Sequence, residues 1–162
     1  MKNWIVMLAL ILGFSACQQD EMDQWRSTDL LPYGIPLSIK TPDSIDVETS
    51  DMGGLMQDVT IKGDENYYVQ IYASDAETTD ISKVKAEQLS EVKSNRYFSQ
   101  IVEEEEAGFI YQTQIDSITN YGFRYIRVQG DKEYIFQTGM TGMYSLEEVR
   151  RMYEAMKPES RN

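Results

Sequence analysis

Apolar and polar residues alternate in several short segments of the first half of the chain, and this alternation is typical of half-buried β-strands. Turn-forming residues such as Pro42, Gly53 and Gly63 separate the segments. The run Tyr-Tyr-Val-Gln-Ile-Tyr-Ala at residues 67–73 has the strongest strand character, and we expect it to be central in the sheet. The four strands predicted in this half cover residues 37–40, 45–48, 56–62 and 67–73.

Two later segments have the period of a helix. Apolar residues recur on one helical face over residues 81–94, and Asp80 can cap the N-terminus of that helix. Ser145 and Glu148 have the spacing of a capping box at the start of a second helix, which Pro158 ends. Short connections favour an antiparallel sheet with two packed amphipathic helices, which makes this an α+β domain. The strands predicted between the helices cover residues 109–115, 121–129 and 133–138.

Residues 103–106 are four consecutive glutamates. On a strand their side chains alternate between the two faces, so at most two of them can approach one cation. A sheet edge protected by charge is therefore the favoured interpretation, and a weak calcium site is the alternative. The acidic residues in the loops do not have the spacing of an EF-hand, and we expect no metal site.

The N-terminus has the pattern of an export signal. Lys2 precedes an apolar run at residues 4–12, which is too short to span a bilayer but suits a signal peptide. Phe14-Ser15-Ala16-Cys17 ends the pattern, and Cys17 is the only cysteine in the chain. This segment resembles the lipobox of bacterial lipoproteins, although Phe14 stands where leucine is usual. The alternatives are an ordinary secretory peptide with an incidental cysteine and an uncleaved N-terminal anchor.

The lipoprotein resemblance implies cleavage before Cys17 and attachment of the mature protein to the outer membrane by acyl chains, including palmitate. The acidic run at residues 18–23 resembles the surface-export signal of Bacteroidota lipoproteins, which implies surface exposure. The alternative is a plain acidic tether on the periplasmic face. The expected organisation is a signal peptide at 1–16, an acidic tether at 17–35, a single domain at 36–158 and a tail at 159–162.

Composition narrows the range of possible functions. The formal net charge of −12 repels nucleic acid phosphates, so we expect no nucleic acid partner. The chain has no histidine, and its single thiol is assigned to the lipid, which excludes histidine relays, cysteine nucleophiles and zinc–thiolate sites. We therefore expect no catalytic residue and no cofactor. An enzyme that uses a pair of carboxylates is a less favoured alternative, because no spacing identifies such a pair.

Tyrosine is abundant, with 11 residues, and many of them lie on or beside the predicted strands. A tyrosine offers a flat apolar ring with a polar end, which suits sugars and peptides. A core and sheet surface that use tyrosine in place of phenylalanine are the alternative and the favoured one. Tyr121, Arg124 and Arg127 are the candidate ligand contacts, because the two arginines are basic positions in an acidic protein. Pairing of these arginines with glutamates on neighbouring strands is the alternative and the favoured one.

Ser44 and Ser117 each follow an aspartate and precede an isoleucine in a predicted turn. These tripeptides resemble the motif on which Bacteroidota O-glycosylate exported proteins, so both serines are candidate O-glycosylation sites. Glycosylation would add bulk and solubility at the surface.

The order of elements over residues 37–156 resembles the PsbP-like fold, whose members are mostly binding or assembly factors. We therefore expect a lipid-anchored, non-catalytic binding or assembly module of the cell envelope that engages a protein or glycan partner. The alternative is a structural subunit of an outer-membrane complex.

Overall fold

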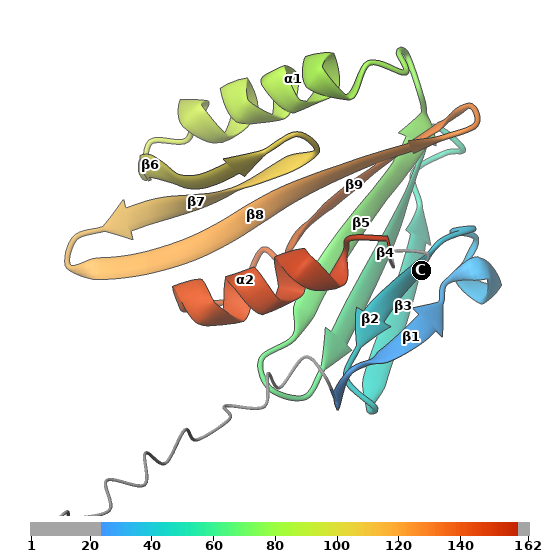
Figure 1. Ribbon diagram of the computed structural model, residues 1–162, viewed down its shortest axis with the longest axis horizontal. Coiled ribbons are helices and arrows are strands. Elements are labelled where there is room, and N and C mark those ends of the chain that lie inside the picture. Colours follow the sequence, from blue (N-terminus) through green and yellow to red (C-terminus); the bar gives the residue numbers. More distant parts are fainter. Residues whose placement is uncertain (1–23, 159–162) are drawn as a thin grey trace, which may run out of the picture.

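The protein is an α+β domain with one large antiparallel sheet, and the computed structural model describes residues 24–158 (Figure 1). The large sheet has seven strands in the order β3-β4-β5-β9-β8-β7-β6. Every neighbouring pair in it is antiparallel. The strands are β3 Ile45–Asp51, β4 Met56–Gly63, β5 Tyr68–Asp75, β6 Phe98–Glu105, β7 Gly108–Ile115, β8 Ile118–Gln129 and β9 Lys132–Thr138.

The two helices, α1 (Ile81–Ser94) and α2 (Leu146–Ala155), lie on opposite faces of the sheet. Val84 of α1 packs with Ile126 of β8 in a small cluster. Tyr125, the residue before Ile126, points to the other face and packs edge-on against Tyr153 of α2, with ring centroids 5.5 Å apart. Because successive residues of a strand point to opposite faces, each helix covers the side chains that point to its own face of the sheet. The fold class predicted from the sequence is confirmed.

Local capping sets the N-terminal end of each helix, as predicted. The Asp80 side chain accepts hydrogen bonds from the backbone N–H groups of Ser82 and Lys83, and α1 covers the expected residues. At α2, the Ser145 side chain accepts from the Glu148 N–H while the Glu148 side chain accepts from the Ser145 N–H. This reciprocal pair satisfies N–H groups that the first turn of a helix leaves without partners.

A second, two-stranded sheet precedes the large one. β1 (Arg26–Asp29) pairs with β2 (Ser38–Thr41), and the short 3-10 helix η2 (Leu31–Tyr33) connects them. Leu30 and Ile35 are completely buried in the main core. The ring of Trp25 lies 5.1 Å from that of Tyr67. The fold therefore begins before the expected domain boundary at residue 36, because Trp25, Leu30 and Ile35 of this polar segment reach the core, although Leu31 is exposed.

Three further details differ from the sequence expectation. β9 holds the central position in the large sheet, and β5 lies next to it. The segment after α1 adds β6, so four strands instead of three follow that helix. β8 begins at Ile118, because only residues 116 and 117 form the turn that was expected to continue to residue 120.

β6 forms one edge of the large sheet, as the acidic run predicted. Its carboxylates alternate between the faces and meet basic residues on both of them. Glu104 pairs with Lys85 of α1 at 3.1 Å, whereas Glu103 pairs with Arg150 of α2 and Glu105 with Lys157. The charged edge thus connects both helices to the sheet.

Candidate functional site: a pocket lined by tyrosines

A pocket of about 450 Å³ opens at the C-terminal end of α1. The hairpin of β7 and β8 extends beyond this end of the helix, so the sheet is not covered there (Figure 1). We call this cavity the tyrosine pocket. The residues that line it are Tyr72, Glu91, Asn95, Tyr97, Tyr111, Thr113, Ile115, Asn120, Tyr121, Arg124, Gln137, Thr138, Gly139, Met140, Gly142 and Tyr144.

Five of the 11 tyrosines of the chain gather around this one cavity. They come from four separate parts of the chain: β5, the turn after α1, the β7–β8 hairpin and the loop before α2. They are Tyr72, Tyr97, Tyr111, Tyr121 and Tyr144. Tyrosine rings offer apolar faces for stacking and hydroxyl groups for hydrogen bonds. Tyr121 and Tyr144 also pack with the main core, so the amphipathic walls of the pocket rest mainly on Tyr72, Tyr97 and Tyr111.

Gly122 makes room for one of these walls. Tyr111 on β7 lies opposite Gly122 on β8, and a Cβ atom at residue 122 would lie 2.7 Å from the Tyr111 hydroxyl. The missing side chain therefore lets the Tyr111 ring lie against the sheet. A larger residue at position 122 would clash with this ring and displace it.

Arg124 supplies the positive charge of the pocket, and its side chain is only 12% exposed. Its Nε donates to Oε1 of Gln88 on α1 at 3.2 Å, and its guanidinium lies 5.9 Å from the Tyr111 ring centroid. The nearest carboxylate oxygen of Glu91 is 3.8 Å from Nη2, which is too long for a hydrogen bond. The helix therefore fixes the guanidinium while Nη2 keeps capacity for a further acceptor.

Side-chain amides fix the loop that forms the outer wall. Asn120 accepts a hydrogen bond from the Tyr144 N–H at 2.6 Å and donates to the Gly142 carbonyl at 3.3 Å. Within residues 24–158 the buried Tyr144 hydroxyl has no hydrogen-bond partner. Burial raises the pKa of Tyr144, so this hydroxyl stays a proton donor at physiological pH. Gln137 donates to Gln70 on the sheet surface beneath the pocket.

The three predicted contact residues do not come together. Tyr121, Arg124 and Arg127 are spaced by three residues on β8, so Tyr121 and Arg127 leave the strand on the face opposite to Arg124. Tyr121 packs against the main core and still borders the tyrosine pocket with Arg124, whereas Arg127 does not line it. Arg127 donates to the backbone carbonyls of Met156, just after α2, and of Ser38 on β2. It therefore joins three elements of the fold instead of contributing to the pocket. The expected cross-strand pairing also differs, since the glutamate near Arg124 comes from α1.

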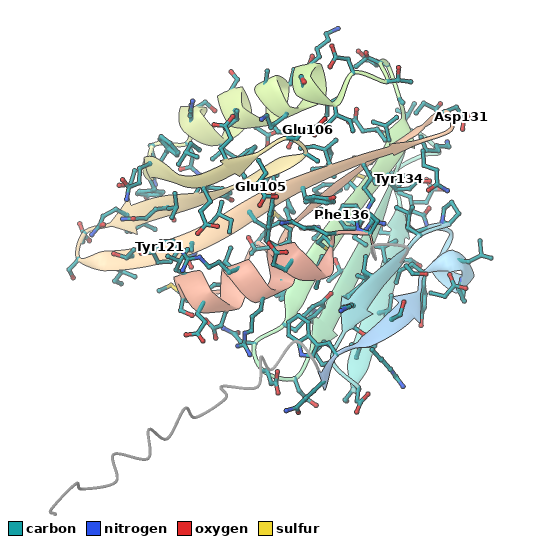
Figure 2. All side chains as sticks on the ribbon, in the orientation of Figure 1. Glu105, Glu106, Tyr121, Asp131, Tyr134 and Phe136 are labelled. Carbon is teal, nitrogen blue, oxygen red and sulfur yellow. The ribbon has the colours of Figure 1, made fainter. Side chains whose placement is uncertain are left out.

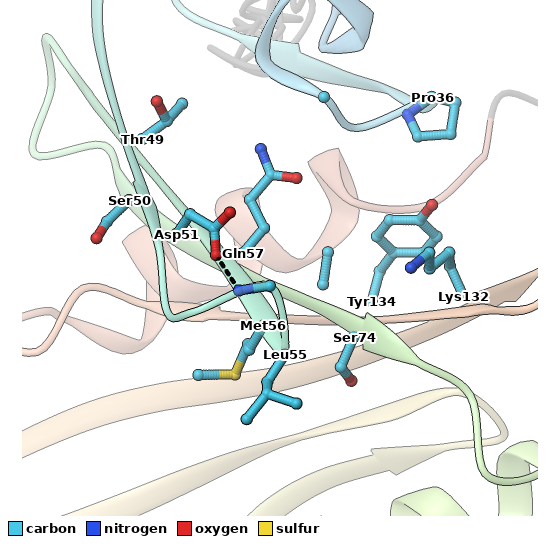
Figure 3. Close-up of a pocket in the computed structure, with 13 residues that line it drawn as sticks. Pro36, Thr49, Ser50, Asp51, Leu55, Met56, Gln57, Ser74, Lys132 and Tyr134 are labelled. Carbon is cyan, nitrogen blue, oxygen red and sulfur yellow. Dashed lines mark hydrogen bonds between the residues drawn. The ribbon is translucent and has the colours of Figure 1, made fainter.

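A separate cavity of about 520 Å³ lies between the β3–β4 loop and Pro36 (Figure 3). Asp51 and Gln57 lie on one side of it, and Tyr134 and Lys132 on the other. The Asp51 carboxylate accepts the Gly54 N–H at 2.6 Å and so shapes the loop. Figure 2 shows that Tyr134 and Tyr121 lie toward opposite ends of the sheet, so the two cavities are distinct. This cavity has a single aromatic residue, which makes it the weaker candidate.

Both candidate O-glycosylation sites are exposed in turns. Ser44 lies in the turn between β2 and β3, and Ser117 lies in the two-residue turn between β7 and β8. Ser117 is two residues from Ile115, which lines the tyrosine pocket. Cys17, the candidate lipidation site, lies outside the described residues. A serine in an exposed turn is accessible to a modifying enzyme.

In the part of the chain that the structure describes, no three acidic side chains cluster closely enough to hold a metal ion. Over the same residues, neither helix has the length and apolar character needed to cross a membrane.

The abundance of tyrosine in the sequence pointed to these residues as candidates. Four of the five pocket tyrosines lie on or beside predicted strands: Tyr72, Tyr111, Tyr121 and Tyr144. It gave no sign of Tyr97 or Asn120, because their place in the pocket depends on which strands become neighbours. No family model, no curated protein and no solved structure matches this chain.

Proposed function

We propose that this protein is a lipid-anchored, non-catalytic binding module of a bacterial cell envelope, and that its tyrosine pocket binds a glycan. The gathering of five tyrosines around one cavity, beside side-chain amides and Arg124, is the observation that supports the proposal. Sugar rings present apolar faces that stack on aromatic rings, and their hydroxyl groups pair with amides and guanidinium groups. A protein partner is the second ligand class that these groups suit.

The start of the fold at Trp25 bears on the proposed anchor. Trp25 is eight residues after Cys17, so the chain between them can span at most about 28 Å. An anchor at Cys17 would therefore hold the domain close to the outer membrane. Several acyl chains on one protein give stable attachment, whereas a single chain does not.

Metabolic labelling with palmitate tests the anchor. The natural chain should incorporate label, and Cys17→Ala should incorporate none, because the Cys17 sulfur is the atom that would take the diacylglycerol. Label that survives Cys17→Ala would rule the anchor out. Protease digestion of intact cells then separates the surface-exposed protein, which is cleaved, from a periplasmic one, which is protected.

A glycan array followed by calorimetry with the strongest hit tests the pocket. Tyr97 is half-buried at the pocket, and Tyr33 is half-buried outside it, so Tyr97→Ala and Tyr33→Ala form a matched pair. Tyr97→Ala should weaken binding about tenfold by removing one stacking surface, and Tyr33→Ala should leave it unchanged. Equal effects of the two variants, or an array without a hit, would refute glycan binding in this pocket.

Purification from detergent-solubilised membranes distinguishes the alternative function. A protein that copurifies in fixed stoichiometry would favour a structural subunit of an outer-membrane complex. The PsbP-like resemblance belongs to the same proposal and rests on element order alone: a mid-chain helix, a meander of strands and a C-terminal helix. The resemblance would be refuted if solved PsbP-like proteins had a strand order different from the order β3-β4-β5-β9-β8-β7-β6 found here.

A further inference from the structure

The two edges of the large sheet are built differently. β6 has two register shifts along its pairing with β7, and three of its carboxylates pair with basic residues. β3 pairs with β4 in unbroken register over all seven of its residues. Bulges and paired charges are features that protect an edge from further strand pairing. β3 has no bulge, and its Glu48 pairs with Lys62 of the neighbouring strand β4.

The direction of the backbone groups on β3 follows from one hydrogen bond. The Met52 N–H donates to the Met56 carbonyl at 2.9 Å, just beyond the end of the ladder. Hydrogen-bonded pairs alternate along an antiparallel ladder, so Asp46, Glu48 and Ser50 bond to β4. The residues whose N–H and C=O groups point away from β4 are Ile45, Val47, Thr49 and Asp51. Between residues 24 and 158, nothing pairs with these outward groups.

The side chains of β3 divide by chemistry between the two faces. Ile45 and Val47 are half-buried and pack against the main core. Asp46 and Glu48 are exposed on the other face, where Lys62 approaches Glu48 at 3.7 Å. A strand added to this edge would meet apolar groups on one face and acidic groups on the other.

We propose that the β3 edge accepts an extended, basic segment of another protein as an eighth strand, in which lysine or arginine alternates with apolar residues. Its basic side chains would face Asp46 and Glu48, and its apolar side chains would cover Ile45 and Val47. A second copy of this chain fits poorly, because β3 paired with itself would bring like charges together. Residues 18–23 fit poorly for the same reason, since they carry three acidic groups and no basic one. The glycan proposal is independent of this one.

Residue-resolved amide hydrogen exchange on the full chain in detergent tests the free edge. The amides of Val47 and Thr49 should exchange about 100-fold faster than those of Glu48 and Ser50, because only the latter pair bonds to β4. Equal protection of all four amides would overturn the proposal, since the edge would then already be covered by the chain itself or by a second copy.

Two octapeptide probes test the partner chemistry, one alternating lysine with valine and one alternating glutamate with valine. The lysine probe should slow exchange at Val47 and Thr49 about fivefold at millimolar concentration, and the glutamate probe should not. N-methylation of the valines should abolish the effect and N-methylation of the lysines should preserve it, because valine N–H groups face β3 in an antiparallel pairing. No effect of the lysine probe, or equal effects of both probes, would overturn the proposal.

A pair of proline variants tests the geometry on the protein side. Thr49→Pro removes an outward N–H, whereas Ser50→Pro removes an N–H that bonds to β4. Thr49→Pro should melt near the natural protein and lose the response to the lysine probe, and Ser50→Pro should melt several degrees lower. Thr49→Val keeps the N–H and should keep the response. A Thr49→Pro protein that still responds would overturn the proposal, and the N-methylated probes test it even if this variant does not fold.

Discussion

Leu30 provides the sharpest test of where the folded domain begins. Its side chain is completely buried although it lies in a polar, acidic segment that looks like a tether in the sequence. Its N–H donates to the Leu37 carbonyl at 2.9 Å, and its own carbonyl accepts from the N–H groups of Tyr33 and Ile35. The neighbouring Leu31 is 61% exposed. Replacing each leucine with alanine removes the same atoms, so any difference in stability between the two variants comes from the burial of Leu30.

Leu30→Ala should lower the free energy of unfolding by about 3 kcal/mol, which is typical for a fully buried leucine that leaves a cavity. Leu31→Ala should change it by less than about 0.5 kcal/mol, because little apolar surface is buried there. With a urea dependence of about 2 kcal/mol per molar, the Leu30→Ala midpoint should fall by about 1.5 M.

Urea unfolding followed by tryptophan fluorescence measures both variants, since Trp25 packs against Tyr67 in the same region. Equal midpoints for Leu30→Ala and the natural protein would refute the placement of residues 24–35 in the cooperative core. A matching loss in Leu31→Ala would refute the argument from burial.

Three further predictions concern Arg127, the Glu148 cap of α2 and the two turns with candidate glycosylation sites. Arg127→Met should lower the free energy of unfolding by about 1–3 kcal/mol in urea, because the carbonyls of Met156 and Ser38 lose their charged donor. Burial raises the pKa of Glu148, but hydrogen bonds from Ser145 and Asn66 outweigh it and leave the pKa below its ordinary value. The stabilisation is therefore present above about pH 4.3 and lost as the pH falls through the lowered pKa, so Glu148→Gln should cost more stability at pH 7 than at pH 3. If Ser44 and Ser117 carry glycans, replacing both with alanine should reduce the intact mass by more than two oxygen atoms, and a loss of only that mass would refute the modification.

The local elements could be read from the sequence because their signals are local. Asp80 caps α1 and the Ser145–Glu148 pair caps α2 where the sequence places them, since capping depends only on residues within one turn. The alternation over residues 67–73 identifies a strand, but β9 takes the central place because strand order depends on contacts between distant segments. β1 was missed, because a four-residue strand with polar side chains has no apolar alternation to reveal it.

The sequence by itself determined the fold class, both helices, the charged edge of the sheet and the absence of histidine. Tertiary structure alone decided that the side chains of Arg124 and Arg127 lie on opposite faces of the sheet. Residues three positions apart on a strand point to opposite faces. Tertiary structure also decided that Tyr72, Tyr97, Tyr111, Tyr121 and Tyr144 share one pocket. These residues are up to 72 positions apart, from Tyr72 to Tyr144, and only the pairing of β5, β9, β8 and β7 in one sheet brings them together.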